Sequence, residues 1–166
     1  MVLFLIAVVA CGKGSDGAGD ESDERGKALM LAAYQGNAGA VKELLAQGAD
    51  VNSSDDRGGT ALMQAAAWGR AEVVALLLEH GADTDARSEA GNTALMAAAK
   101  KGHCDIARAL LDSGADPLLE NESGETAIVG AAFGAHSDCV IMLKEAEVKA
   151  QKKSAGGESP GVAPQP

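Results

Sequence analysis

The stretch Asp55–Arg87, DDRGGTALMQAAAWGRAEVVALLLEHGADTDAR, is the unit from which most of this chain is built. A shift of 33 residues towards the C-terminus matches Gly58, Thr60, Leu62, Gly69, Gly81 and Asp83 with Gly91, Thr93, Leu95, Gly102, Gly114 and Asp116. The same shift towards the N-terminus matches Gly69, Leu77, Gly81, Ala82 and Asp83 with Gly36, Leu44, Gly48, Ala49 and Asp50. A fixed period of this length indicates a repeat array, in which one supersecondary unit stacks on copies of itself.

Each unit has the pattern of two short helices. Thr60 stands at a helix N-cap, and Gly69 provides the left-handed residue that ends a first helix expected over Ala61–Trp68. The second helix, Glu72–His80, has an apolar face at helical spacing and ends at Gly81. Between units, glycines allow positive φ at the tips of β-hairpin-like fingers, at Gly58, Gly91 and Gly124. Helices this short are marginal alone, so each unit is expected to depend on its neighbours.

The motif G-x-T-A-L-M-x-A-A-x-x-G, followed by a Leu-rich run and G-A-D, resembles the ankyrin repeat. The resemblance implies an all-α, ankyrin-like solenoid of about four helix-turn-helix units with short β-hairpin-like fingers, over residues 23–150. The four units are Asp23–Ser54, Asp55–Arg87, Ser88–Glu120 and Asn121 to about Glu147. Where that family has Thr-Pro-Leu-His, this chain has Thr60-Ala61-Leu62-Met63 and its equivalents, so apolar packing is expected in place of the histidine hydrogen bond.

The two terminal units depart from the pattern. The first lacks the Gly-x-Thr finger, and the last has Gly134-Ala135 where the order Ala-Gly is expected. Terminal units of solenoids are commonly atypical because one face meets water. A polar closing helix is expected from Asp138 to about Lys149, and residues 151–166 are expected to form a disordered tail because they lack periodicity and are rich in proline.

The composition excludes several classes of function. The net charge of -10 is not offset by a basic block, so a nucleic acid is not expected as a partner, and a basic or neutral protein fits better. No nucleophile-base set, P-loop or paired carboxylate stands at a spacing that would converge in a solenoid. The chain is therefore predicted to be no enzyme, with no cofactor and no small-molecule substrate.

The N-terminus carries an apolar run, Met1–Ala10, which is too short to cross a bilayer because a spanning helix needs about 20 residues. Val8-Val9-Ala10-Cys11 resembles the lipobox of bacterial lipoproteins, although Val8 replaces the usual Leu and no Lys or Arg precedes the run. The resemblance implies removal of residues 1–10, lipidation of Cys11, a flexible linker over residues 11–22 and, since Gly12 follows the cysteine, an outer-membrane or periplasmic-side location in the envelope. The true start is expected to lie upstream. The alternatives are an uncleaved anchor and a buried N-terminal strand or helix turn.

Two further cysteines, Cys104 and Cys139, leave three interpretations open. A disulfide requires Cα atoms within about 7 Å, and neighbouring helices are commonly about 8 to 10 Å apart, so two free thiols that act as small packing residues are preferred. The nearest approach to a metal cluster is the set His103, Cys104, Asp105, His136 and Cys139. No metal is predicted, because His103 and His136 are equivalent positions in adjacent units.

The aromatic residues Tyr34, Trp68 and Phe133 all fall at the ends of first helices in a chain with only 2% aromatics. In the family that this chain resembles, those positions and the finger tips line a concave partner-binding groove. The predicted groove residues are Tyr34, Asp56, Arg57, Trp68, Glu89, Asn92, Lys100, Lys101, Glu122, Glu125 and Phe133. The alternative is that the rings merely cover neighbouring helices.

These patterns predict a non-catalytic protein-interaction module, tethered to the bacterial envelope through lipid on Cys11, with an unidentified protein partner. One alternative is a metal- or redox-responsive envelope protein that uses the His and Cys residues. Another is an inhibitor or immunity-type protein that masks a partner enzyme through the same groove.

Overall fold

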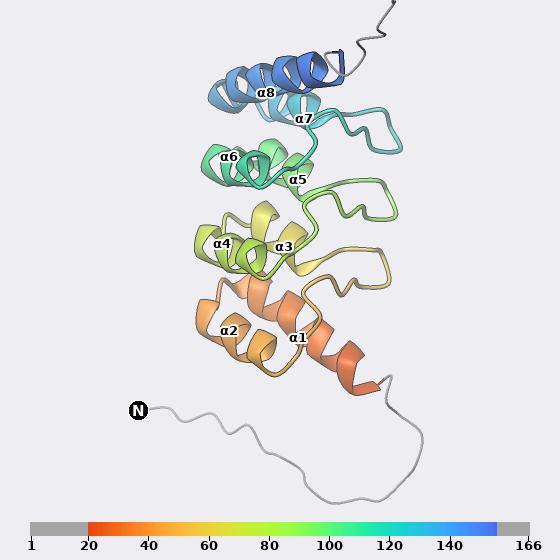
Figure 1. Ribbon diagram of the computed structural model, residues 1–166, viewed down its shortest axis with the longest axis vertical. Helices are drawn as coiled ribbons and strands as arrows, with labels where there is room; N and C mark the ends of the chain where they lie inside the picture. The colour runs from red at the N-terminus through yellow and green to blue at the C-terminus, as the bar shows by residue number, and fades with distance from the viewer. Residues whose placement is uncertain (1–19, 156–166) are drawn as a thin grey trace, which may run out of the picture.

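The computed structural model describes residues 20–155, with side chains described for residues 23–153. In this part the chain forms helices stacked in pairs along one axis (Figure 1). Their bounds are α1 (Asp20–Gln35), α2 (Ala38–Ala46), α3 (Ala61–Ala67), α4 (Ala71–Glu79), α5 (Ala94–Lys101), α6 (Cys104–Asp112), α7 (Ala127–Phe133) and α8 (Ser137–Ala155). The all-α stack of about four paired units confirms the predicted fold class. Cys11, the predicted signal segment and most of the predicted linker lie outside the described residues.

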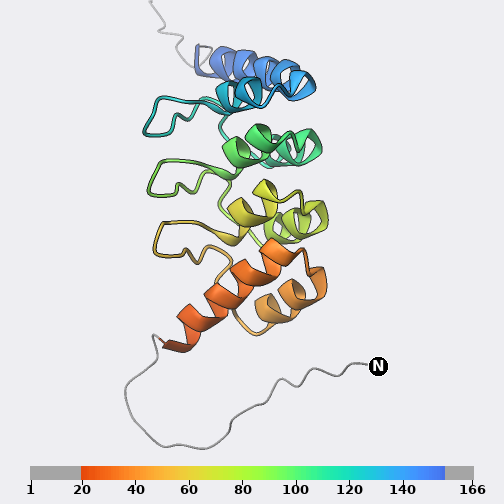
Figure 2. The ribbon, with the colours of Figure 1, turned by 180° about the vertical axis from the view of Figure 1, so that it is seen from behind.

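The helices form two rows, with the fingers on one side (Figures 1 and 2). The first row contains α1, α3, α5 and α7, and the second contains α2, α4, α6 and α8. The fingers project from the side of the first row. Each finger closes as a tight turn, shown by the hydrogen bonds Asp55 N to Gly59 O (2.9 Å), Ser88 N to Asn92 O (3.0 Å) and Asn121 N to Glu125 O (3.0 Å).

The predicted helix signals operate in the inner units. The Thr60 hydroxyl accepts a hydrogen bond from Met63 N at 3.3 Å, and that of Thr93 accepts one from Met96 N at 3.4 Å. Gly69 and its equivalent Gly102 take positive φ at the helix ends, with φ of 69° and 78°. The finger glycines also take positive φ, with 70° at Gly58, 75° at Gly91 and 72° at Gly124. The local signals therefore place both ends of the first helices.

The core consists of Leu, Val, Met and closely packed Ala. The alanines Ala61, Ala65 and Ala66 of α3 are fully buried, and small side chains of this kind let first-row helices approach closely. Met63 and Met96 are buried where the resembled family has histidine, which confirms the expected apolar packing.

Backbone and side-chain hydrogen bonds also tie successive units together outside the helices. Asp83 N donates to Asn52 Oδ1 at 2.8 Å, and one unit later Asp116 N donates to Asp85 Oδ1 at 2.9 Å. In the fingers, Glu89 N donates to Arg57 O at 2.8 Å. Because the bonds recur at equivalent positions, the turns and fingers stack in register with the helices.

The terminal helices run beyond their expected bounds. α1 begins at Asp20, inside the segment 11–22 predicted as a linker, and α8 continues to Ala155, inside the segment 151–166 predicted as a disordered tail. Inner second helices end at a glycine, but Glu147 stands at the equivalent position of α8, so no residue there favours a break. None of the described helices has both the length and the apolar composition that crossing a bilayer requires.

Candidate functional site

Three hollows follow one another between the fingers and the first row of helices, with volumes of about 270, 430 and 330 Å³. The first and second share Asp55 and Gln64 in their linings, and the second and third share Ala67, Asn92 and Ala97. The shared residues make the hollows one continuous depression, here called the finger groove. It spans all four units of the stack.

The floor of the finger groove changes along the stack. At one repeated position the lining residue is Leu31, Gln64, Ala97 and then Gly130, so the side chain shrinks from the first unit to the last. At the position three residues further on, the residues are Tyr34, Ala67, Lys100 and Phe133. The groove therefore has the Tyr34 ring at its first end, and Lys100 and the small residue Gly130 line its far end.

Many of the predicted site residues lie on this groove. Tyr34 lines the first hollow, Arg57 and Glu89 line the second, and Lys100 and Lys101 line the third. Asp56 and Glu122 are exposed on the fingers but line none of the hollows, and the same holds for Trp68 and Phe133 on the helices. The structure thus brings most of the predicted residues to the finger groove. Of the three aromatic residues, Tyr34 lines the groove, whereas Trp68 and Phe133 do not.

The three aromatic rings have different surroundings. Tyr34 and Trp68 pack edge to face, with ring centroids 4.9 Å apart and an interplanar angle of 79°. They are 43% and 50% exposed, whereas Phe133 is 77% exposed. Contact with a neighbouring helix therefore buries part of the Tyr34 and Trp68 rings and only a small part of the Phe133 ring. An apolar ring left this open to water favours contact with a further apolar surface.

Two predicted groove residues also hold the fingers together. The side-chain amide of Asn121 donates to Asn92 Oδ1 at 2.9 Å and to Glu125 Oε2 at 3.2 Å. Asn121 Oδ1 in turn accepts from the backbone N–H groups of Ser123 and Glu125, both at 2.9 Å. Asn92 and Glu125 therefore shape the groove wall in addition to lining it.

Asp55 and Asn121 were missed as site-shaping residues. Asp55 Oδ1 accepts from Arg57 N at 2.9 Å and from Gly59 N at 2.8 Å, which fixes the finger that presents Asp56 and Arg57. The signal was present in the sequence, because Asp or Asn ahead of a glycine-containing turn is typical of an Asx turn.

A ladder of side chains at positions 70, 103 and 136 links successive units. His103 and His136 were considered only as possible metal ligands, and the contacts of all three residues with the preceding unit were missed. Each lies against a glycine of the preceding unit: a Cβ on Gly36 would lie 2.8 Å from Arg70, one on Gly69 would lie 2.7 Å from His103, and one on Gly102 would lie 2.5 Å from His136. Arg70 Nε also donates to Tyr34 O at 3.1 Å. The two histidines therefore occupy separate interfaces between units.

Cys104 and Cys139 form a disulfide, with Cα atoms 5.1 Å apart, so the preferred prediction of two free thiols was wrong. The error lay in comparing a Cα separation with a distance between helix axes. Each Cα lies about 2.3 Å from its axis, so facing Cα atoms of helices about 8 to 10 Å apart approach to roughly 3.4 to 5.4 Å. The disulfide also withdraws both sulfurs from the metal-ligand set, and within residues 23–153 no group of three or more His, Cys, Asp or Glu is placed to hold a metal.

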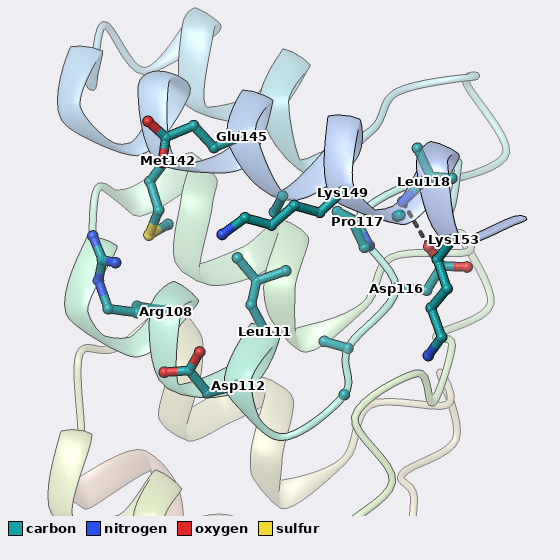
Figure 3. Close-up of a pocket in the computed structure, with 14 residues that line it drawn as sticks. Arg108, Leu111, Asp112, Asp116, Pro117, Leu118, Met142, Glu145, Lys149 and Lys153 are labelled. Carbon is teal, nitrogen blue, oxygen red and sulfur yellow. Dashed lines mark hydrogen bonds between the residues drawn. The ribbon is translucent and has the colours of Figure 1, made fainter. Parts of the chain in front are cut away.

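A separate hollow of about 720 Å³ lies between α6 and the extended part of α8 (Figure 3). Met142 and Lys149 reach from α8 towards Leu111 on α6, with Arg108 and Asp112 at the rim. The lining mixes both signs of charge over an apolar base, so it selects no single ligand chemistry. Nearby on α8, partial burial raises the pKa of the Glu147 carboxyl, and Lys144 opposes this effect.

Comparison with known proteins adds one finding. The family model described as "Ankyrin repeats (3 copies)" matches the chain over residues 3–88, 29–121 and 81–155, and together these ranges cover most of its length. No curated protein matches the chain.

Proposed function

Because the chain belongs to the ankyrin-repeat family, whose repeats are typically non-catalytic modules for protein–protein interaction, we propose that the finger groove binds one protein partner in the bacterial envelope. The observation that carries this proposal is the continuous groove, with the exposed ring of Tyr34 at one end and Lys100 and Lys101 at the other. Aromatic residues are among those most enriched in interface hot spots.

The groove suits binding with little rearrangement. Its floor lies on packed helices, and its wall is fixed by the Asx turn at Asp55 and by the Asn121 hydrogen bonds. A preformed site loses little conformational entropy on binding, so more of the contact energy appears as affinity. The acidic finger residues Asp56, Glu89 and Glu122 would attract a partner with a basic surface, because complementary charge accelerates encounter.

The test is capture of a partner from envelope extract by the full chain and by Trp68→Ala, which removes the ring that packs against Tyr34 at one end of the finger groove. The variant should retain its helicity, because Trp68 is 50% exposed and lies at the end of α3, but it should capture much less partner. Val148→Ala is the matched control, because Val148 is also exposed, at 44%, and lies on α8 away from the finger groove. Equal capture by all three proteins would refute the groove assignment.

We also propose that lipid on Cys11 tethers the chain to the envelope, on the outer-membrane or periplasmic side. The lipobox-like tetrad ending at Cys11 supports this proposal, and so does the Cys104–Cys139 disulfide, because disulfides persist in oxidising compartments. The linker after Cys11 would then hold the stack clear of the membrane surface.

Cys11→Ser tests the tether. This variant should lose metabolic labelling with fatty acid and move from the membrane fraction to the soluble fraction, because the lipid supplies the membrane affinity. Cys104→Ser is the control for a general effect of removing a cysteine and should stay labelled. Labelling of Cys11→Ser at the level of the unmodified chain would contradict the proposal.

A further inference from the structure

The disulfide joins the last two units of the stack. Cys104 is the first residue of α6 in the third unit, and Cys139 lies in α8 of the fourth. The Cys139 side chain is fully buried, and Cys104 is half-buried. We propose that this disulfide is a redox latch on the fourth unit: when it is reduced, α7 and α8 open while the first three units stay folded.

The fourth unit lacks several of the local features that stabilise the inner units. Thr126 makes no capping hydrogen bond, and its Oγ1 is buried without a partner, whereas Thr60 and Thr93 both cap their helices. Ala135 takes φ of 58° at the position where the other units have glycine, and a side chain in this left-handed region is strained. Gly130 lies inside α7, where glycine lowers helix stability.

The fourth unit also has fewer neighbours. α5 packs against α3, α7 and its own partner α6, whereas α7, at the end of the stack, packs against α5 and its own partner α8. The turn bonds that link Asn52 to Asp83 and Asp85 to Asp116 have no continuation, because α8 runs on through the equivalent position, Lys149. The stability of a repeat is approximately its own stability plus its interfaces with adjacent repeats, so the fourth unit depends most on its covalent link.

Exposure determines which sulfur is attacked. A thiolate of a dithiol reductant, such as a protein with a reactive dithiol, reaches Sγ of half-buried Cys104 and not that of fully buried Cys139. The new S–S bond joins the reductant to Cys104, and Cys139 leaves as a thiolate and takes up a proton. The second thiol of the reductant then displaces Cys104, which is protonated in turn. Two electrons and two protons pass from the dithiol to the protein, and the reductant is left as a disulfide.

Opening of the fourth unit would remove part of the finger groove, because Glu125, Thr126 and Gly130 of this unit line its third hollow. The latch itself is independent of any partner, so its test measures folding alone. Amide hydrogen exchange of the full chain is followed helix by helix, with and without excess dithiothreitol.

Reduction should accelerate exchange in α7 and α8 by roughly 30- to 1,000-fold, the range expected for loss of a disulfide, and exchange in α3 and α4 by less than about threefold. The double variant Cys104→Ser/Cys139→Ala should show the fast rates without dithiothreitol and no response to it. Unchanged exchange in α7 and α8 would overturn the proposal. Equal acceleration in α3 and α4 would also overturn it, because the disulfide would then stabilise the whole stack.

Two further measurements test the strain at Ala135 and the preferential attack on Cys104. Adding Ala135→Gly to the cysteine-free double variant should slow exchange in α7 and α8 several-fold by relieving the left-handed strain, and the absence of slowing would contradict the argument from local strain. Brief exposure to glutathione should place the first mixed disulfide on Cys104. An adduct found first on Cys139 would overturn the order of attack.

Discussion

Gly102→Ala tests the ladder between units, and Gly81→Ala is its matched control. Both glycines end a helix at nearly the same φ, 78° and 79°. They differ in what a new methyl group would meet, because a Cβ at residue 81 has no atom within 4 Å, whereas one at residue 102 lies 2.5 Å from the His136 ring. The difference between the two variants therefore isolates the contact between the third and fourth units.

The two costs can be estimated separately. A non-glycine residue in the left-handed region destabilises the folded state by about 1 to 2 kcal/mol. Replacing glycine by alanine also reduces the conformational entropy of the unfolded chain, which offsets about 0.4 to 1 kcal/mol of that loss. Gly81→Ala should therefore lower the free energy of unfolding by about 1 kcal/mol. Gly102→Ala carries the same cost plus about 1 to 3 kcal/mol for overpacking against His136, so about 3 kcal/mol in total.

Thermal unfolding followed by circular dichroism measures both variants. At about 3 °C per kcal/mol for a chain of this size, Gly81→Ala should lower Tm by about 3 °C and Gly102→Ala by about 9 °C. In a His136→Ala background, Gly102→Ala should lower Tm by no more than Gly81→Ala does, because the colliding ring is gone. Equal effects of the two alanines on Tm, or a Gly102→Ala effect that persists without the ring, would refute the ladder.

Two further predictions concern the last unit. Thr126→Val should raise the free energy of unfolding by about 1 kcal/mol, because it removes a buried hydroxyl that has no partner. Thr93→Val should lower the free energy of unfolding by about 1 kcal/mol, because the Thr93 hydroxyl caps α5. Urea titration compares the two variants. A change of the same sign in both would contradict the different roles given to the two hydroxyls. Burial raises the pKa of Glu147, so the stability contribution of this carboxyl is present below pH 4.5 and is lost as pH rises through the raised pKa. Glu147→Gln should therefore raise Tm at pH 7 and leave it unchanged well below pH 4.5, and a gain at both pH values would exclude ionisation as the cause.

Much of the candidate site could be predicted because it follows the repeat. Tyr34, Arg57, Glu89, Lys100 and Lys101 were assigned to one face from their place in each unit, and the structure places them along the finger groove. A repeat position has a similar place in every unit, since each unit has the same two-helix form. Equivalent positions do not all line the groove, because Glu89 lines it and its equivalents Asp56 and Glu122 do not.

The sequence could not show which polar side chains bond to one another. Asn92 and Glu125 were predicted as groove residues, but their shared hydrogen bonds to Asn121 depend on the stacking of neighbouring fingers. Trp68 lies one position away from the repeat position of Tyr34 and Phe133, and only the stacked helices bring its ring against Tyr34. Interactions between units depend on their separation and relative orientation, which no single unit encodes.

The sequence by itself determined the period, the two helices of each unit, the threonine caps and the glycine turns, because these depend on local backbone preferences repeated every 33 residues. The tertiary structure decided the Cys104–Cys139 disulfide, the packing of Arg70, His103 and His136 on glycines of preceding units, and the shape of the finger groove. The physical reason is that these features depend on the distance between adjacent units. A few ångströms at that interface separate a disulfide from two free thiols.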